Sequence, residues 1–246
     1  MKMLDLCCRG GLASAGYWLS GCFTEVVGID VEDMKGVYPF DFIQGDAFAL
    51  DYEFLSQFDF IHVSPPCQFY STATPEWARD RHPRLIPNAH RLCRAWGGPY
   101  VVENVGGSTQ DLRPTLRLSG FDVGLPMQRY RYFHVHEEKL RVSDENFDRR
   151  SSEEIHRCSY EDTQRLSFDE CSPGCSFMSI DARLNVISPH DSDTTRDELI
   201  EAFGLCEISH HHLRRLTCEH IKQGVPPRMT RLIAQQMFPK AMIGAA

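Results

Sequence analysis

The sequence predicts an α/β fold built on a doubly wound, mostly parallel sheet. Short apolar runs bounded by glycine or proline alternate with helical spacing over the first half of the chain, as in buried parallel strands joined by crossover segments. Acidic or polar residues sit where these runs end. In such a sheet the strand ends meet at one edge, where ligands bind. With 246 residues and 42% hydrophobic content, the chain can bury an ordinary core.

The predicted elements can be placed in order along the chain. The strands are expected in MLDL (3–6), TEVVGID (24–30), the run closed by IQGDAF (43–48), FDFIHVSPP (58–66) and PYVVENV (99–105), and the helices in 10–21, TRDELIEAFGL (195–205) and PPRMTRLIAQQMF (226–238). Between 137 and 190 charged and serine residues increase and the periodicity weakens. We therefore expect a main domain in 1–136, a small inserted subdomain in 137–190, and a return to the main domain in 191–246.

Composition narrows the class of protein. The sequence has neither an export signal nor an apolar run of the roughly 18 residues that a membrane span needs, so we expect a soluble, cytoplasmic protein with reduced cysteines. The net charge of −8 argues against a nucleic-acid partner on average. Arginines nevertheless gather in 79–94 and in QRYRYF (128–133). These segments are either a phosphate-binding patch or a solvated basic surface.

Two motifs carry candidate reactive groups. In VSPPCQFYST two prolines precede Cys67 at the end of a predicted strand, and in VVENVGG another apolar run ends at Glu103. Each has a plain alternative, because free cysteines often fill cores and buried carboxylates often have structural partners. Together at one sheet edge, they suit a nucleophile and a proton donor for a polar heterocycle.

A third motif points to a nucleoside-bearing cofactor. LDLCCRGGLASAGY is a strand followed by a small-residue turn into a helix, which places a ligand at a helix start. Asp30 and Asp46 close the next two apolar runs. Carboxylates at this distance commonly bind ribose hydroxyls.

Taken in order, these motifs resemble the DNA (cytosine-5)-methyltransferase family, particularly its short, phage-type members. LDLCCRGG is similar to the family's DLFCGAGG motif, and PPCQ, ENV, the arginines of QRYRYF and the closing IKQGVPPRMTRLIAQQM appear in family order. The resemblance covers most of residues 3–135 and 193–238. It implies a Rossmann-like methyltransferase fold with a recognition subdomain in 137–190, in an enzyme of DNA methylation such as those of restriction-modification systems.

The resemblance implies roles for individual residues. Cys67 matches the thiolate that adds to carbon 6 of cytosine, Glu103 the group that acts at ring nitrogen 3, Arg131 the arginine that grips the base carbonyl, and Arg129 a brace for the catalytic loop, with Asn104 holding that loop. S-adenosylmethionine is the implied cofactor. The implied cofactor-binding residues are Asp5, Cys7, Arg9, Gly11, Asp30, Val31, Asp46, Ala47, Pro66 and Gln223. The implied partner is duplex DNA with the target cytosine flipped out, bound by a monomer.

The sequence departs from the family pattern at several positions. Cys7 replaces a phenylalanine that stacks on adenine, Arg9 replaces the first glycine of the turn, Met127 replaces a glutamine and Gln223 replaces an asparagine. Arg9 either points inward to pair with a cofactor carboxylate, which could even favour a cofactor with an extra carboxylate, or points outward because the turn has shifted onto Gly10 and Gly11.

Three alternatives remain open at this point. Zinc could be bound by His156, Cys158, Cys171 and Cys175, or by the histidines between 210 and 220 together with Cys218, although the irregular spacing favours ordinary side chains. A catalytically silent binder of S-adenosylmethionine and DNA would be expected to lack Cys67 or Glu103. The same chemistry could also act on RNA or single-stranded DNA.

Overall fold

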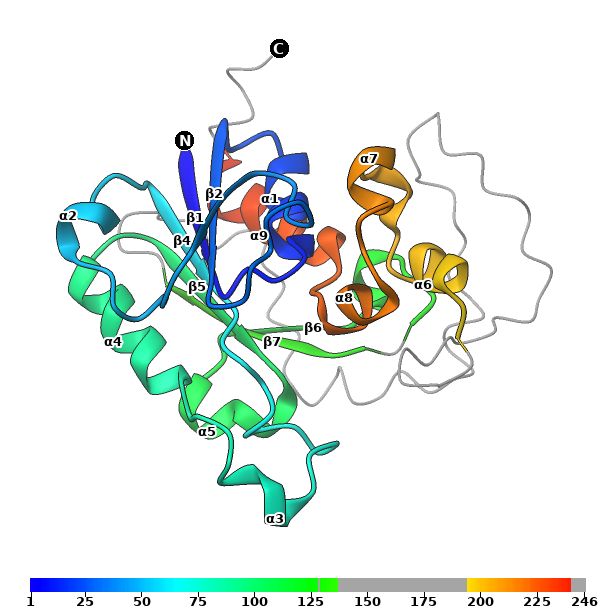
Figure 1. Cartoon of the computed structure of the whole chain (residues 1–246). Coiled ribbons are helices and arrows are strands. Elements are labelled where there is room, and N and C mark those ends of the chain that lie inside the picture. Colours follow the sequence, from blue (N-terminus) through cyan, green and yellow to red (C-terminus); the bar gives the residue numbers. More distant parts are fainter. Residues whose placement is uncertain (128, 137–193, 240–246) are drawn as a thin grey trace. The chain divides into compact units, whose positions relative to one another are not determined.

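A computed structural model describes residues 1–127, 129–136 and 194–239 (Figure 1). The chain divides into two compact units, one comprising 1–140 and 186–246 and the other 141–185. The second unit, the expected recognition subdomain of 137–190 and the four zinc candidates from His156 to Cys175 lie outside the described residues.

The first unit is organised around a seven-stranded sheet with the order β3-β2-β1-β4-β5-β7-β6. The strands are β1 (Lys2–Leu6), β2 (Glu25–Asp30), β3 (Asp41–Gln44), β4 (Phe60–Val63), β5 (Tyr100–Asn104), β6 (Leu116–Leu118) and β7 (Arg131–His136). The first five strands are parallel, whereas β7 runs antiparallel to β5 and β6. The predicted doubly wound, mostly parallel fold is confirmed.

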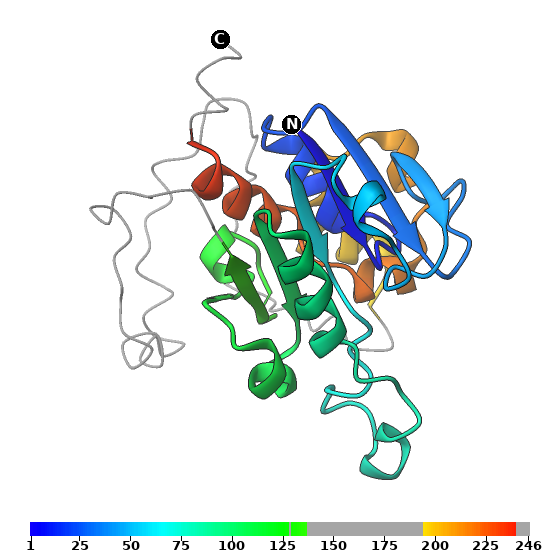
Figure 2. The same ribbon diagram turned by 90° about the vertical axis from the view of Figure 1, so that its left-hand side faces the viewer.

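Helices connect the strands and cover the sheet (Figure 2). They are α1 (Leu12–Leu19), α2 (Tyr52–Leu55), α3 (Glu76–Arg79), α4 (Ile86–Trp96), α5 (Thr109–Leu112), α6 (Arg196–Ala202), α7 (His210–Leu213), α8 (Cys218–Gln223) and α9 (Pro227–Met237). Short 3-10 turns lie at Gly106–Ser108, Phe121–Val123 and Leu205–Glu207. None of the helices in the described ranges is long and apolar enough to cross a bilayer.

The two faces of the sheet form two hydrophobic cores because side chains alternate along each strand. Met3 and Phe60 point to one face and pack with residues of α1 and α9. Their neighbours Leu4 and Ile61 point to the other face and pack with residues of α2, α4 and α5. Asp5 and Glu103 follow Met3 and Val101 in this alternation, so both carboxylates lie on the α1/α9 side.

Helices α1 and α9 approach each other closely. A Cβ atom at Gly16 would lie 2.0 Å from the carbonyl oxygen of Pro227, so a larger residue does not fit. The Thr230 hydroxyl donates to the Ala13 carbonyl oxygen over 2.8 Å. A third core beside α1 contains Phe203, Leu213 and Ile221 from the C-terminal helices.

The structure adds elements that the sequence patterns did not predict. Helix α4 buries Ile86, Ala89, His90 and Cys93, a helical spacing within a segment that stood out only for its arginines. Strand β7 begins at Arg131 inside the QRYRYF motif and pairs antiparallel with β5. The predicted helices at 10–21, 195–205 and 226–238 correspond to α1, α6 and α9.

Candidate active site

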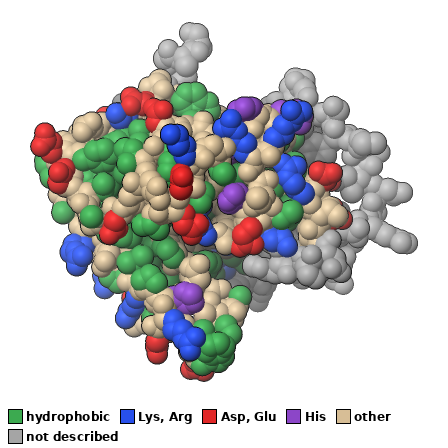
Figure 3. All heavy atoms as spheres, viewed as in Figure 1, with side chains coloured by type: hydrophobic (Ala, Val, Ile, Leu, Met, Phe, Trp, Pro, Cys, Tyr) green, Lys and Arg blue, Asp and Glu red, His purple; other side chains and the backbone are tan. Residues whose placement is uncertain are grey.

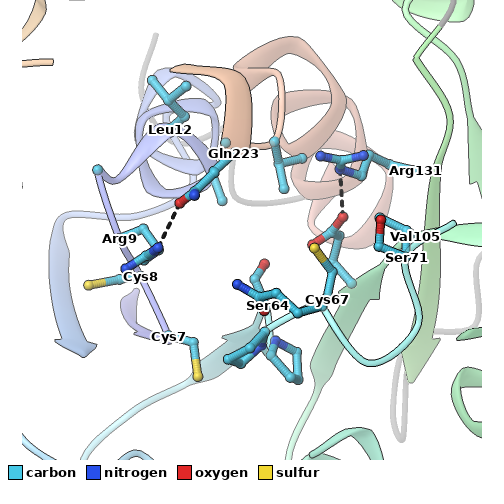
Figure 4. Close-up of a pocket in the computed structure, with 18 of the residues that line it drawn as sticks. Cys7, Cys8, Arg9, Leu12, Ser64, Cys67, Ser71, Val105, Arg131 and Gln223 are labelled. Carbon is cyan, nitrogen blue, oxygen red and sulfur yellow. Dashed lines mark hydrogen bonds and ion pairs between the residues drawn. The ribbon is translucent and has the colours of Figure 1, made fainter. Parts of the chain in front are cut away.

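A cavity of about 940 Å³ opens at the carboxyl edge of the parallel strands (Figure 4). Its lining comes from the ends of β1, β2, β4 and β5, from β7, and from α8. Every site residue expected from the sequence lines it. Cys67 and Arg131 lie on one side, and Cys7 and Arg9 lie on the opposite side. The strand ends thus bring together residues that are distant in sequence.

Cys67 is held in the loop that follows β4. Its carbonyl oxygen accepts hydrogen bonds from the backbone N–H groups of Tyr70, over 2.9 Å, and Ser71, over 2.8 Å. The Asn104 side-chain amide donates to the carbonyl oxygen of Pro65 over 2.8 Å and so ties this loop to β5. Burial raises the pKa of the Cys67 thiol, and the positive charges of Arg131 and Arg129 oppose that rise.

Glu103 and Arg131 form a buried ion pair beside Cys67. The distance from Arg131 Nε to Glu103 Oε1 is 2.8 Å, and the two side chains are 9% and 7% exposed. Antiparallel pairing of β5 with β7 places them together. Burial raises the pKa of Glu103, whereas Arg131, a hydrogen bond from Ser64 and Arg129 pull it down. The two arginines and Ser64 thus oppose the effect of burial on this carboxyl group.

Arg129 connects the reactive end of the cavity to the C-terminal segment. One guanidinium nitrogen donates to the Lys222 carbonyl oxygen and, over 3.4 Å, to that of Gly224. The guanidinium also lies over the ring of Phe203, with 5.3 Å from Cζ to the centroid. Its Nε and Nη1 are buried and have no hydrogen-bond partner among the described residues. They can therefore donate to a bound group.

The turn after β1 has an unusual backbone. Cys7, Arg9 and Gly11 have φ values of 60°, 45° and 74°, in the left-handed region that favours glycine. At Gly11 a Cβ atom would lie 2.6 Å from Pro39, so glycine is also required for space. The backbone N–H of Arg9 donates to Asp30 Oδ2 over 3.0 Å, which fixes the turn against the end of β2.

The Arg9 side chain extends along the rim of the cavity. Its guanidinium donates to Gln223 Oε1 over 2.7 Å and forms an ion pair with Glu32 (Figure 4). The charge is thus engaged by the protein across the rim of the cavity instead of being left for a cofactor carboxylate. Its positive φ gives a physical reason for the glycine that the family has at this position.

Asp5 is a buried carboxylate with one oxygen available. The Ser14 hydroxyl donates to its Oδ2 and also lies 2.6 Å from the Tyr38 hydroxyl. Asp5 Oδ1 is buried and has no hydrogen-bond partner within the described ranges. Burial raises the pKa of Asp5 to about 7, against the stabilising hydrogen bond from Ser14.

The lining of the Arg9 side fits S-adenosylmethionine. Asp5, Asp30, Glu32 and Asp46 line the cavity, and Asp30 and Glu32 contact Arg9. Carboxylates suit a sulfonium cation, an ammonium group and ribose hydroxyls. Asp30 receives backbone N–H groups from Arg9 and Glu32, and Asp46 receives one from Phe48, which fixes both carboxylates. Asp5 Oδ1 remains as an acceptor. The donor set therefore matches the cofactor that the sequence resemblance implies.

Four residues of this region were not predicted. Glu32 lies just beyond the predicted ribose-binding acid, and Ser64 just before the two prolines, so proximity to a motif was the available signal. His62 and Tyr17 are buried behind the cavity and had no such signal. In the part of the chain that the structure describes, no three His, Cys, Asp or Glu side chains are placed to hold a metal ion, and this covers the histidines from 210 to 220.

The arginines of the predicted basic patch differ in their surroundings. Arg84 Nε donates to Asp111 Oδ2 over 2.5 Å, and the Tyr70 hydroxyl donates to the same oxygen over 2.7 Å. Arg84 therefore braces the loop and does not offer a free charge. Arg81 is exposed and lies 5.1 Å from the ring of Trp77, which is 73% exposed. Basic side chains and exposed hydrophobic surface meet at the tip that carries α3 (Figure 3).

Several solved structures are similar to this one. The EhMeth methyltransferase of Entamoeba histolytica matches with a TM-score of 0.52 and 13% identity over 97% of this chain and 98% of that chain. A protein described as a DNA modification methyltransferase encoded within an E. coli prophage matches with a TM-score of 0.42 and 20% identity over 55% and 46% of the two chains. The S. pombe Dnmt2 methyltransferase matches with a TM-score of 0.40 and 15% identity over 55% and 48%.

These matches differ in extent. The matched region spans about half the length of the prophage and S. pombe proteins. No protein-family model matches the sequence, and no curated protein matches it. The Entamoeba likeness shows that the chain has the fold of that methyltransferase. The resemblance seen in the sequence thus extends to the fold.

Proposed function

We propose that this chain transfers a methyl group from S-adenosylmethionine to carbon 5 of cytosine in DNA. The observation that carries the proposal is one cavity with two chemically different sides. Cys67, Glu103 and Arg131 gather on one side, and carboxylates suited to a cationic nucleoside gather on the other. A nucleophile facing a methyl donor across a single cavity is the arrangement that this reaction needs.

The described residues suggest a role for each group. The Cys67 sulfur forms a bond to carbon 6 of the ring, and the negative charge that develops is neutralised by a proton from the Glu103 carboxyl group to nitrogen 3. The contacts favour a different division of roles between the arginines from the one that the sequence resemblance implies. Arg131 keeps Glu103 in place, and the Arg129 nitrogens that have no partner among the described residues can donate to the base carbonyl. When bound, S-adenosylmethionine would supply the methyl group to carbon 5 and leave as S-adenosylhomocysteine. Loss of the carbon-5 proton, cleavage of the bond between Cys67 and carbon 6, and return of the nitrogen-3 proton to Glu103 then restore the aromatic ring and the free cysteine.

A cytosine inside a duplex cannot reach a nucleophile at the back of a cavity. We therefore expect the base to be flipped out of the stack, with the segment from Gln68 to Leu85 against the nucleic acid. Ser71, Thr72 and Ala73 line the cavity, and Trp77 and Arg81 extend from it into solvent. The same segment would be used if the target were single-stranded DNA or RNA.

Labelled S-adenosylmethionine and a mixed panel of duplex DNA, single-stranded DNA and RNA give the direct test, with mass analysis of the nucleosides released by digestion. We expect 5-methylcytosine from duplex DNA. If only the single-stranded nucleic acids become labelled, the substrate is single-stranded DNA or RNA and not duplex DNA. Cofactor binding without label in any substrate would indicate a silent binding protein.

The covalent step gives a sharper prediction. Duplex DNA carrying 5-fluorocytosine at the target should trap the wild-type protein in an adduct that survives denaturation, because fluorine at carbon 5 cannot leave as the proton does. The adduct should be absent from Cys67→Ser and present in the matched control Cys93→Ser, whose thiol is buried under α4 away from the cavity. An adduct that persists in Cys67→Ser would show that another residue is the nucleophile.

A further inference from the structure

A chain of hydrogen bonds reaches Glu103 from the interior of the protein. The Tyr17 hydroxyl lies 3.0 Å from His62 Nδ1, and His62 Nε2 lies 2.8 Å from the Ser64 hydroxyl. Ser64 and Glu103 follow Val63 and Val102, which are partners in the sheet, so the two residues are neighbours at the ends of β4 and β5 and line the same cavity. Hydrogen bonding by the Ser64 hydroxyl lowers the pKa of Glu103. Tyr17 and His62 are fully buried between α1 and the sheet. The chain therefore links helix α1, strand β4 and strand β5 to the carboxyl group at the reactive end of the cavity.

The direction of these hydrogen bonds follows from the carboxylate. Ser64 uses its hydrogen for Glu103, so its oxygen accepts from His62, which must then carry its hydrogen on Nε2. His62 Nδ1 is left as an acceptor, and the Tyr17 hydroxyl donates to it. Burial supports this arrangement, because it lowers the pKa of His62 to about 3 and raises the pKa of Tyr17. The imidazole is neutral and the phenol is protonated throughout the physiological range.

We propose that His62 is a positioning residue, held in its Nε2–H tautomer by Tyr17, which orients the Ser64 hydroxyl toward Glu103 and so fixes the carboxylate that acts on the substrate ring. This inference rests on the function proposed above. Its chemical consequence concerns acid strength: a buried glutamate without this donor would hold its proton more tightly. The chain therefore keeps the Glu103 carboxyl group able both to give a proton and to take it back.

Other charged and titratable groups also act on Glu103 and must be held constant in a test. They are Arg131 from β7, Arg129 from the segment before β7, Asp5 from β1, Cys67 from the loop after β4, and Tyr17 from α1. Within the described ranges no charged group shifts the pKa of His62, which burial alone lowers. Substitutions at Ser64 and His62 therefore alter the hydrogen-bond chain and leave these charged groups unchanged.

The tautomer can be measured without any catalytic assay. Nitrogen-15 NMR of histidine-labelled, cofactor-free protein, with the His62 signals assigned from His62→Gln, should show hydrogen on Nε2 and no titration between pH of about 5 and about 8. In Tyr17→Phe, which keeps the ring but removes the donor, we expect a second population with hydrogen on Nδ1. Hydrogen on Nδ1 in the wild type, or titration near the ordinary pKa, would overturn the proposal.

The effect on Glu103 is the second measurement. Carbon-13 NMR of the Glu103 carboxyl group, assigned with Glu103→Gln, should show its pKa higher by about one unit in Ser64→Ala and in His62→Leu. His62→Gln should restore the wild-type value, because its side-chain N–H can replace Nε2–H. A Leu variant that fails to fold would leave Ser64→Ala and the Gln rescue to decide.

The pH profile of methyl transfer separates this proposal from the function on which it rests. If protonated Glu103 is required, the alkaline limb of kcat should move to higher pH in Ser64→Ala by the same amount as the NMR value. If the protein transfers methyl groups but Ser64→Ala leaves the pKa of Glu103 unchanged, the proposed hydrogen-bond chain is refuted and the proposed function is not. The expected NMR shifts in a protein that transfers no methyl group would support the chain and refute the function.

Discussion

At the scale of single residues, the site depends on carboxyl groups that burial has moved toward neutrality. Asp5 is 1% exposed and its pKa rises to about 7, and the pKa of Glu103 is also raised. Asp5 can therefore change protonation near physiological pH, and burial moves the pKa of Glu103 in the same direction. Burying these carboxyl groups costs folding free energy that depends on pH. Their protonation can therefore be measured through the stability of the protein.

Asp5 therefore gives a prediction about stability and pH. In the folded state Asp5 keeps its proton up to about pH 7, whereas in the unfolded chain it loses the proton near its ordinary pKa of 3.8. Between these values the folded state binds more protons, so this contribution is fully present at low pH and is lost as pH rises through 7. In Asp5→Asn the side chain does not ionise, so this pH-dependent contribution to the free energy of unfolding is missing.

Urea titrations of cofactor-free wild type and Asp5→Asn at several pH values test this. The two free energies of unfolding should be similar near pH 4 and should separate in favour of the variant by about 2–4 kcal/mol near pH 8, since one pKa unit corresponds to about 1.4 kcal/mol. His62 acts in the opposite direction in both proteins because its folded-state pKa is lowered. Curves that stay parallel would show that Asp5 ionises normally.

Site residues that belong to a recognisable motif could be predicted from the sequence. Cys67 and Glu103 follow apolar runs, and the sheet edge collects such residues whatever the details of packing. The partners of Arg9 were not predictable, because Gln223 lies on α8 and is brought near by the fold alone. The same is true of Tyr17 and His62, which look like ordinary core positions when each is considered alone.

At the scale of elements, the segment between β4 and α4 separates into a braced part and a free part. Asp111 of α5 binds both Tyr70 and Arg84, whereas Arg81 and Trp77 around α3 project into solvent. Parallel strands were predictable because continuous apolar runs identify them. The antiparallel strand β7 was not, because its alternating residues RYFHVH do not form such a run.

This division predicts different results for two neighbouring arginines. Arg81→Ala should weaken DNA binding across all sequences and reduce the slope of log K against log salt by about 1, because an exposed charge that contacts phosphate releases counterions. Arg84→Ala should leave the slope unchanged and reduce the rate of methyl transfer, because the segment that follows Cys67 loses one of its two contacts with Asp111 and keeps only that of Tyr70. Equal effects on the slope would mean that both arginines contact phosphate.

At the scale of the whole molecule, the C-terminal segment completes the domain that the N-terminal strands begin. Helix α9 packs on α1, and both cover the sheet face that carries Met3, Phe60 and Val101. This arrangement was predictable in outline from the helical spacing of 226–238. The closeness of the two helices was not, because the contact at Gly16 depends on how the axes cross.

Gly16→Ala tests how much this contact matters. The added methyl group would enter space held by Pro227 and Thr230, so we expect a loss of about 1–3 kcal/mol in the free energy of unfolding despite the better helix propensity of alanine. Gly45→Ala is the matched control, because its Cβ atom would meet nothing within 4 Å. That variant should stay within about 0.5 kcal/mol of the wild type. Similar stabilities for the two variants would contradict the close packing.

The same packing has a consequence for synthesis on the ribosome. The central strand β1 is made first, but the helix that shields one of its faces is α9, which ends at residue 237. Until that point emerges, Met3, Phe60 and Val101 have only α1 to cover them, and the nascent chain presents an apolar surface to its surroundings. Domains whose core needs contacts between residues distant in sequence fold late, and they are prone to aggregate until those contacts form. The chain should therefore acquire protease resistance only once α9 has emerged from the ribosome, and chaperones that shield nascent chains should raise its yield.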